Sequence, residues 1–299
     1  MQSVFDELYE NSLAKCEFKN LISIITAEEN IRLAYRNLKK NAGSRTPGTD
    51  GKTIADLAKM SEPELIGFVQ QKFNWYQPQS VRRKEIPKGN GKTRPLGIPT
   101  IMDRLIQQCV LQVMEPICEA KFCETSNGFR PNRGVENALA QAEKHMQKSN
   151  LHIVIDIDIK GFFDSVNHGK LLRQIWAMGI HDKKLLSIIS AMLKAEVAGI
   201  GFPEKGTPQG GILSPLLSNI VLNELDCPMS QDSDLPFSLP CSDSFPLQVL
   251  PAEPTQNPNL SACNSACLHS QYCSSEARFA DSQHLPLCPK YSHSYKYRM

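Results

Sequence analysis

The first 226 residues predict a mixed fold in which packed helices accompany short antiparallel strands. Apolar side chains recur at helical spacing from Ile101 to Phe122, which predicts the clearest helix of the chain. Asn90-Gly91 separates two extended segments and is typical of a tight hairpin, because both turn positions need a positive φ. Residues 151–159 place four isoleucines on one side with the period of two that a half-buried strand requires.

Two helices and a loop are predicted before the hairpin. Residues 19–41 have the pattern of one helix of moderate amphipathicity, with Ile24, Ile31 and Leu38 on one side. Residues 43–51 are so rich in glycine and turn-forming residues that we expect a loop there. A second helix is predicted over residues 62–74.

The predicted hairpin has strands at residues 81–87 and 92–98 around a turn at 88–91. It also concentrates positive charge, because one acid, Glu85, accompanies six basic residues: Arg82, Arg83, Lys84, Lys88, Lys92 and Arg94. The ordinary explanation of such a run is a solvated charged surface. The alternative is a surface that binds phosphate groups.

The middle of the chain alternates helices with polar turns. Pro116 is expected to kink the helix that starts at Ile101 near its end. A polar turn at residues 127–134 precedes a helix that runs to about Lys148. The strand at 151–159 then carries its acidic residues on the polar face.

Three more helices follow the strand. Two are predicted around residues 170–178 and 182–197, and a short hairpin is expected to carry the glycine-rich segment 206–211. Ser214-Pro215 predicts the start of the last helix, with serine as N-cap and proline at the first helical position.

The composition changes near Asp226, where the last predicted helix ends. Residues 227–299 contain no glycine, but they carry nine of the 20 prolines, six of the ten cysteines and 13 serines. A stretch with so few large aliphatic residues does not bury enough surface to offset the entropy lost on ordering. We therefore expect residues 227–299 to be disordered or translated out of frame.

Charge, apolar segments and cysteine content indicate in which compartment we expect the protein. Residues 1–226 carry a net charge of +4, which alone does not indicate a nucleic-acid partner. The N-terminus has no basic stretch followed by an apolar core, and no apolar run approaches the length of a membrane span. The first 226 residues hold four scattered cysteines, which suit a reducing compartment. We expect a cytoplasmic protein that does not enter a membrane.

Asp158 and Asp156 share the polar face of the predicted strand. Nucleotidyl transfer needs two divalent cations about 3.5–4 Å apart, held by carboxylates, and an acid at a strand end is a suitable first ligand. Two solvated acids on a half-buried strand are the ordinary alternative. Phe163 follows Asp158 by five residues, where an aromatic ring either lies under a nucleotide sugar or packs into the core.

Two further segments suit a bound nucleotide. The loop at residues 208–211 offers the side-chain amide of Gln209 and a flexible backbone beside a helix start. Lys88, Lys92 and Arg94 of the hairpin are suited to a triphosphate, since arginine gives a bidentate contact and lysine a point charge. A Gly-Gly turn alone is a weak indication of such a site.

Five segments of the chain occur in the order of a known family. Together they resemble the bacterial group II intron reverse transcriptases, the family of intron-encoded maturases. The resemblance covers residues 20–226, and the segments that carry it are Ala34–Thr53, Ile86–Pro99, Gly128–Pro131, Asp158–Asp164 and Gly206–Asp226.

The resemblance implies an α+β fold, the fingers and palm of a right-hand polymerase, with an antiparallel sheet and packed helices. Residues 1–80 would form an N-terminal helical extension and part of the fingers. Residues 81–226 would complete the fingers and supply part of the palm. Residues 227–299 would be a tail that is foreign to the family.

The resemblance also assigns roles to single residues. Asp158 would be the first catalytic ligand of Mg²⁺, beside the backbone carbonyl of Ile159, and an intact family member is expected to hold two such ions. Phe163 would be the steric gate against a ribose 2′-hydroxyl. Gln209 would contact the incoming dNTP. Two basic residues, Lys88 and Arg94, would hold its triphosphate.

Nucleic-acid contacts are expected from the remaining basic residues near these segments. They are Arg82, Arg83, Lys84, Lys92, Arg130 and Arg133.

The resemblance ends near Asp226. The family continues with a hairpin that bears an aromatic-Ala-Asp-Asp box, followed by a thumb of helices. Here Phe279-Ala280-Asp281-Ser282 matches only the start of that box, so Asp281 is either a further metal ligand or a chance match. We expect a truncated copy that lacks part of the palm and the thumb and has no meaningful polymerase turnover.

Two functions are therefore predicted. The first is an RNA-directed DNA polymerase that copies an intron RNA template from a DNA primer. The alternative is a non-catalytic, maturase-like fragment that binds intron RNA through its N-terminal helices and basic hairpin. A steep fall of RNA affinity with salt would support the second.

Overall fold

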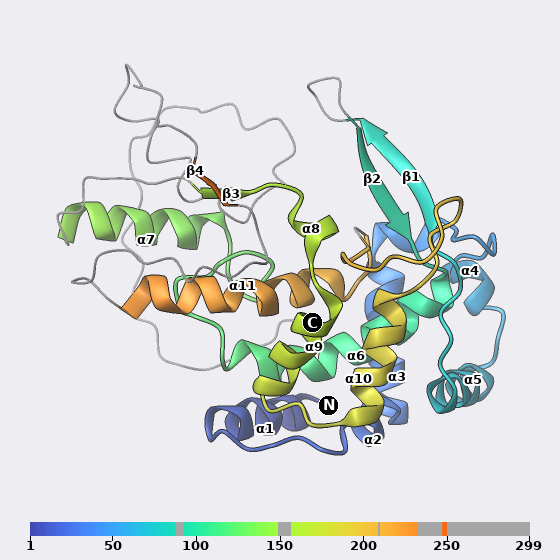
Figure 1. The fold of residues 1–299 in the computed structure, drawn as a ribbon. Coiled ribbons are helices and arrows are strands. Elements are labelled where there is room, and N and C mark those ends of the chain that lie inside the picture. Colours follow the sequence, from blue (N-terminus) through green and yellow to red (C-terminus); the bar gives the residue numbers. More distant parts are fainter. Residues whose placement is uncertain (88–92, 149–156, 209, 232–246, 250–299) are drawn as a thin grey trace, which may run out of the picture.

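The computed structural model describes residues 1–87, 93–148, 157–208, 210–231 and 247–249 (Figure 1). Within these residues the helices pack around α6 (Ile101–Glu119), and each of the two sheets has two antiparallel strands. None of the described helices is long and apolar enough to cross a membrane. The mixture of helices and short strands agrees with the α+β class predicted from the sequence.

Helix α6 is buried on nearly all sides, as its apolar residues and their spacing predict. Ile101, Leu105, Val110 and Met114 have no exposed surface. The helix packs against α1 (Gln2–Leu13), α2 (Leu21–Ile25), α3 (Glu28–Lys40) and α11 (Ser214–Gln231). A helix with neighbours on most sides has to pair its buried polar side chains internally, and Asp103, Gln107, Gln112 and Glu119 of α6 do so.

The predicted single helix over residues 19–41 is two helices, because the chain leaves helical geometry between α2 and α3. Ala27 has extended backbone (φ −61°, ψ 140°) and precedes α3. The side-chain amide of Asn30 donates to the carbonyl of Ile25 (2.8 Å) and to that of Cys109 in α6 (3.1 Å). Gln112 of α6 donates in turn to the Asn30 side-chain oxygen (2.6 Å). This buried network fixes the break and joins α3 to α6.

The loop predicted at residues 43–51 contains one turn of 3-10 helix, η1 (Ala42–Arg45), and precedes the short helix α4 (Ile54–Leu57). Arg104 of α6 donates to the carbonyl of Gly43 (2.7 Å) and to that of Thr46 (2.6 Å). Gly48 lies so close to Thr100 that a Cβ there would come within 2.6 Å of its Cα. The loop is therefore docked on the first turn of α6. Helix α5 (Glu62–Asn74) has the predicted bounds.

The predicted basic hairpin is present as β1 (Arg82–Pro87) and β2 (Thr93–Ile98), which pair from Arg82 with Ile98 to Pro87 with Thr93. It projects from the helices in Figure 1. Its turn lies outside the described residues. Val81, just before β1, exchanges backbone hydrogen bonds with the Glu196–Ala198 segment (2.7 and 2.9 Å), which anchors the base of the hairpin.

The chain after β2 mostly follows the prediction. Helices α7 (Val135–Lys148), α9 (His168–Ala177) and α10 (Lys183–Leu193) are present, and a short helix that was not predicted, α8 (Phe162–Ser165), follows β3 (Ile157–Ile159). Helix α1 was not predicted either. Among the described residues, the short hairpin expected to carry the segment 206–211 is not formed, and isolated bridges, such as that between Asn167 and Lys205, occur near it instead.

The last predicted helix, α11, differs from the prediction at both ends. It starts at Ser214 itself, one residue before the predicted first helical position, and the Ser214 hydroxyl donates to the carbonyl of Pro208 (2.8 Å). It continues past Asp226 to Gln231. Strand β4 (Leu247–Val249) pairs antiparallel with β3, so these parts of the predicted disordered tail have regular structure. The predicted loss of the thumb concerns residues largely outside the described part and stays a prediction.

Glu115 of α6 gives the fold a pH-dependent stability. Its carboxyl lines a hollow of about 850 Å³ between α6 and the N-terminal helices, where burial, and next the charge of Glu119, raise its pKa to about 7. Between the unfolded pKa of about 4.3 and pH 7 the folded protein holds a proton that the unfolded chain releases, so the stability falls as the pH rises.

We expect Glu115→Gln to be more stable than the wild type at pH 8 by about 1–3 kcal/mol, and to differ little from it at pH 4.5. Urea unfolding of both proteins at the two pH values measures this difference. A difference that does not change with pH would contradict the prediction.

Candidate nucleotide-binding site

The glycine-rich loop at residues 206–211 lies against the segment that follows β3. The backbone N–H of Thr207 donates to the carbonyl of Phe163 (2.7 Å), and that of Gly206 donates to the carbonyl of Val166 (2.8 Å). Gly206 has a positive φ of 95°, and a Cβ there would lie 3.0 Å from the Phe163 carbonyl oxygen. The start of the loop thus depends on a glycine that lets two backbones approach.

The other end of the same loop lies against the basic hairpin. Gly210 has a φ of 113°, and a Cβ there would lie 2.5 Å from the carbonyl oxygen of Gly97 and 2.8 Å from Cδ1 of Leu96, both in β2. Beyond it, the N–H of Ile212 donates to the side chain of Gln107 in α6 (2.8 Å). Three of the predicted segments, far apart in the sequence, therefore meet at this loop.

Asp158 lies on the exposed side of β3. Ile157 is buried, Asp158 is exposed and Ile159 is half-buried, which confirms the predicted alternation for the described part of the strand. Gly161, with a φ of 62°, then turns the chain into α8. Asp156 lies outside the described residues.

The donors around Asp158 fit Mg²⁺ in part. Its carboxylate and the carbonyl of Ile159 are oxygen donors, the type that Mg²⁺ prefers. Among the residues that the structure describes, no group of three or more His, Cys, Asp or Glu side chains is arranged to hold a metal ion. Asp281 is not among those residues.

Phe163 is held at the junction of α8 and the glycine-rich loop. Its side chain is half-buried, and its ring meets that of Phe162 edge-on at 5.4 Å between centroids. Its carbonyl accepts the hydrogen bond from Thr207 described above. A backbone fixed in this way keeps the ring next to the loop.

The described basic residues of the hairpin differ in their surroundings. Arg82 is half-buried and Lys84 is exposed, while Arg83 forms an ion pair with Glu85 (2.7 Å) on the same strand. The backbone of Arg94 pairs with that of Ile86. The side chain of Arg94 lies outside the described part of the structure, as do Lys88, Lys92 and Gln209 entirely.

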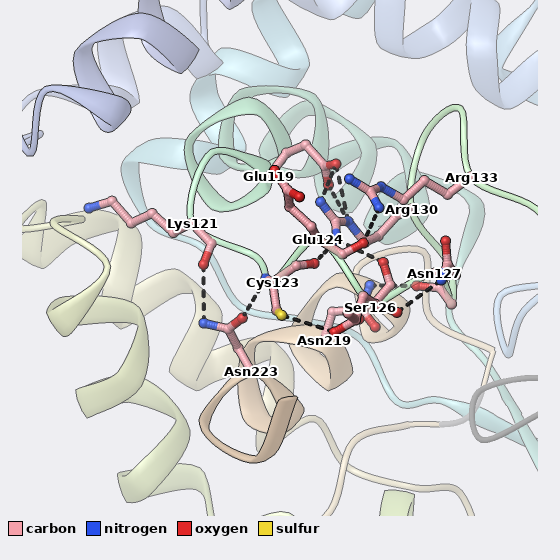
Figure 2. A network of polar contacts seen from close by, with 12 residues as sticks. Glu119, Lys121, Cys123, Glu124, Ser126, Asn127, Arg130, Arg133, Asn219 and Asn223 are labelled. Atoms are coloured by element: carbon pink, nitrogen blue, oxygen red, sulfur yellow. Dashed lines mark hydrogen bonds and ion pairs between the residues drawn. The ribbon is translucent and has the colours of Figure 1, made fainter. Parts of the chain in front are cut away.

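Arg130 is buried, which corrects its predicted contact with nucleic acid. Its guanidinium forms an ion pair with Glu119 at the end of α6 (2.7 Å), and each of the two side chains is 3% exposed (Figure 2). It also donates to the carbonyls of Cys123 and Ser126 (2.5 and 2.8 Å). All three guanidinium nitrogens are occupied inside the protein, so this arginine holds the loop that it belongs to.

The same loop is tied to α11. The side-chain amide of Asn219 donates to the carbonyl of Gly128 (2.8 Å). The side-chain amide of Asn223 donates to the backbone carbonyl of Lys121 (3.3 Å; Figure 2). Arg133, partly exposed, donates to the carbonyl of Glu124. Neither Asn219 nor Glu119 was predicted from the sequence to stabilise this loop, although polar residues at core positions of apolar helices indicate such a role.

Comparison with known proteins decides the family. The reverse transcriptase (RNA-dependent DNA polymerase) family matches residues 86–240, which is more than half of the chain. The chain belongs to the reverse transcriptase family. The match begins at the end of β1 and includes β2, β3 and the glycine-rich loop, so the segments that meet in space are also segments of the family domain.

Curated relatives specify the branch of this family. Protein YkfC of Escherichia coli is 37% identical over 70% of this chain and 56% of its own length. Group II intron-encoded protein LtrA of Lactococcus lactis is 38% identical over 75% of the chain and 38% of its own length. A putative COX1/OXI3 intron 1 protein of Saccharomyces cerevisiae is 29% identical over 75% of the chain and 26% of its own length.

The relatives identify the chain as a reverse transcriptase of the group II intron-encoded type, and it spans about half or less of their length. Among solved structures, a partial Cas6-RT-Cas1–Cas2 complex is 22% identical, with a TM-score of 0.45 over 70% of this chain and 34% of the other. That likeness is too distant to inform the site.

Gly210→Ala should destabilise the reverse transcriptase domain more than Gly199→Ala does. Both glycines have positive φ, so both substitutions strain the backbone by about 1–2 kcal/mol, but a Cβ at Gly199 meets no atom within 4 Å. The clash of Gly210→Ala with β2 adds about 1–3 kcal/mol. Urea unfolding of the two variants measures the difference, and equal costs would show that the loop is not packed on the hairpin.

Arg130→Met should cost about 3–5 kcal/mol of unfolding free energy, because it leaves the Glu119 carboxylate buried without a partner. Adding Glu119→Met should recover much of the loss, since it removes the isolated charge. Arg133→Met, which loses one carbonyl contact near the surface, is the control and should cost about 1 kcal/mol or less. If the double variant were as unstable as the sum of the single ones, the pairing would not be what stabilises the loop.

Proposed function

We propose that this chain acts in RNA-directed DNA synthesis on an intron RNA, as the fingers and first part of the palm of a group II intron reverse transcriptase. The observation that supports it is the meeting of the glycine-rich loop with both the Phe163 segment and β2. These segments are the ones that the family resemblance connects with the incoming nucleotide. The partners would be an RNA template, a DNA primer and a dNTP.

The proposed chemistry centres on Asp158. Its exposed carboxylate and the Ile159 carbonyl would supply oxygen ligands to Mg²⁺, which neutralises the charge that develops on the phosphates. The ring of Phe163 would limit the space at the sugar and so exclude a ribose 2′-hydroxyl. Gln209, Lys88 and Arg94 would contact the nucleotide, with Arg94 able to grip phosphate by two hydrogen bonds. Asp281 remains a candidate for a further ligand.

Contacts with template and primer are proposed for the basic residues that the sequence predicts to bind nucleic acid, with the exception of the buried Arg130. Arg82, Arg83, Lys84 and Lys92 of the hairpin, together with Arg133, would neutralise backbone phosphates, and such binding weakens as salt rises. Cys16, Cys109, Cys118 and Cys123 form no disulfide among the described residues, which is consistent with the proposed cytoplasmic location.

A second candidate function is RNA binding without catalysis. It is favoured by one observation: within the described residues, no acidic cluster of metal-binding size surrounds Asp158. A two-metal reaction needs carboxylates beyond Asp158. If this second function is the correct one, the protein has no polymerase turnover, as we expect from the sequence.

Asp158→Asn should lower template-dependent primer extension at least about 100-fold, because a metal ligand of the transition state is lost. The full chain is assayed with an RNA template, a DNA primer, dNTPs and Mg²⁺. Glu204→Gln, which neutralises an exposed acid shortly before the glycine-rich loop, is the matched control and should leave the rate unchanged.

Two results would count against the first candidate. Extension that persists in Asp158→Asn would remove this residue from the reaction. The absence of any product, combined with RNA binding that weakens steeply with salt, would favour the second candidate.

A further inference from the structure

A surface hollow of about 640 Å³ lies where the α1–α2 linker meets the α9–α10 linker. It is lined by Glu17, Lys19, Trp176, His181, Asp182, Lys183 and Lys184. In Figure 1 these linkers lie beside α1 and α2, at the end of the molecule opposite the β1–β2 hairpin. The hollow is therefore separate from the candidate nucleotide-binding site.

The hollow contains a flat aromatic surface that is held in place. The indole of Trp176 is 40% exposed and stacks on the ring of His181, with 4.1 Å between centroids and 19° between planes. His181 is held at both nitrogens: Nε2 lies 3.1 Å from the carbonyl oxygen of Trp176, and Nδ1 lies 3.3 Å from a carboxylate oxygen of Glu17. An exposed aromatic ring fixed in this way is a suitable platform for a nucleobase.

The backbone beneath the platform is also fixed. The two linkers exchange hydrogen bonds, from the N–H of Phe18 to the carbonyl of Gly179 and from the N–H of His181 to the carbonyl of Phe18 (both 2.8 Å). Gly179 has a φ of 84°, and a Cβ there would lie 3.0 Å from the carbonyl oxygen of Cys16. A ligand that stacks on the indole would therefore not have to order the linkers first.

The charges around the platform suit a phosphate backbone. Lys183 and Lys184 are exposed in the first turn of α10, where the helix dipole disfavours cations, and no ion pair among the described residues uses either of them. Asp182 is buried and its carboxylate accepts hydrogen bonds from the N–H groups of Ile22, Lys184 and Leu185. Lys19 offsets Glu17 (2.9 Å). With Lys19 offset by Glu17, Lys183 and Lys184 outweigh the buried carboxylate of Asp182, so the hollow carries a small net positive charge.

We propose that this hollow binds a single-stranded segment of RNA, with one base stacked on Trp176 and the neighbouring phosphates held by Lys183 and Lys184. This proposal depends on the proposed function, because it assumes an RNA partner. It adds a second RNA-binding surface, remote from the candidate nucleotide-binding site. Stacking on an aromatic ring tolerates any base, so this surface contributes affinity and not sequence selection.

The tryptophan content allows a direct test on the full chain. The protein has two tryptophans, so Trp75→Phe leaves Trp176 as the sole tryptophan. Titration with a 12-nucleotide oligo(U) should quench its fluorescence to saturation, with an affinity that falls as salt rises. The reciprocal variant, Trp176→Phe, retains Trp75 as the reporter and should show no saturable quenching.

Two sets of substitutions then test the parts of the surface. Trp176→Ala should weaken oligo(U) binding by about 5- to 100-fold in a filter-binding assay, whereas Trp176→Phe, which keeps an aromatic ring, should retain most of the affinity. Lys183→Ala with Lys184→Ala should weaken binding by about tenfold and reduce its salt dependence. The matched control is Lys39→Ala with Lys40→Ala, another exposed lysine pair, and should have little effect.

Several results would overturn the proposal. RNA binding with no change in Trp176 fluorescence would place the contact elsewhere. Equal losses of oligo(U) affinity from the two lysine-pair variants would indicate unspecific electrostatic attraction. Quenching of Trp176 by free UMP as strong as that by oligo(U) would indicate a mononucleotide pocket. Primer extension that depends on Asp158 would still support the proposed function in each of these cases, so the two proposals fail independently.

Discussion

Burial of helix α6 is the constraint on which the rest of the structure depends. A helix largely surrounded by protein has to pair most of its buried polar groups within the fold, and each pairing partner is then fixed relative to the helix. Asp103 is buried, which raises the pKa of its carboxyl, and it accepts hydrogen bonds from Tyr76 (2.9 Å), Gln79 and Thr100 (2.7 Å). Further polar residues along the helix bind other segments in the same manner: Arg104, Gln107, Gln112 and Glu119.

These pairings connect the core to the site. Gln107 holds the end of the glycine-rich loop, and Glu119 holds the Arg130 loop, which Asn219 joins to α11. The loop itself bridges the Phe163 segment and β2. One buried helix thus positions the end of the glycine-rich loop and the Arg130 loop, although neither loop belongs to it.

Local sequence patterns predicted the elements well where one side of an element is apolar and the other polar. The strict alternation at Ile157–Ile159, the dipeptide Asn90-Gly91 between extended segments and the spacing of α6 were sufficient. The break between α2 and α3 could not be predicted, because it depends on Asn30 reaching a carbonyl of α6 across 79 positions of the sequence. Helix α1 was not predicted, because its buried face holds only Phe5, Leu8 and Ser12 and so gives a sparse apolar pattern.

The candidate site, like the fold, has residues that local sequence could predict and residues that it could not. Residue types and order indicated Asp158, Phe163 and the glycine-rich loop, and the structure brings the last two into contact. Sequence gave no means to tell a solvent-facing arginine from a buried one, so Arg130 was assigned to nucleic acid. Its environment is set by Glu119, which belongs to another element, and by carbonyls that become available only when the loop has folded around it.

The close approach of Gly210 to β2 has a mechanical consequence. Because two backbones touch there without an intervening side chain, the hairpin and the loop cannot slide past each other independently. A force applied to the hairpin, for example by a strand of nucleic acid drawn through the protein, is passed directly to the loop and from there to α8. Under the proposed function, movement of a template along the hairpin would therefore be felt at the candidate nucleotide-binding loop through a contact that only glycine allows.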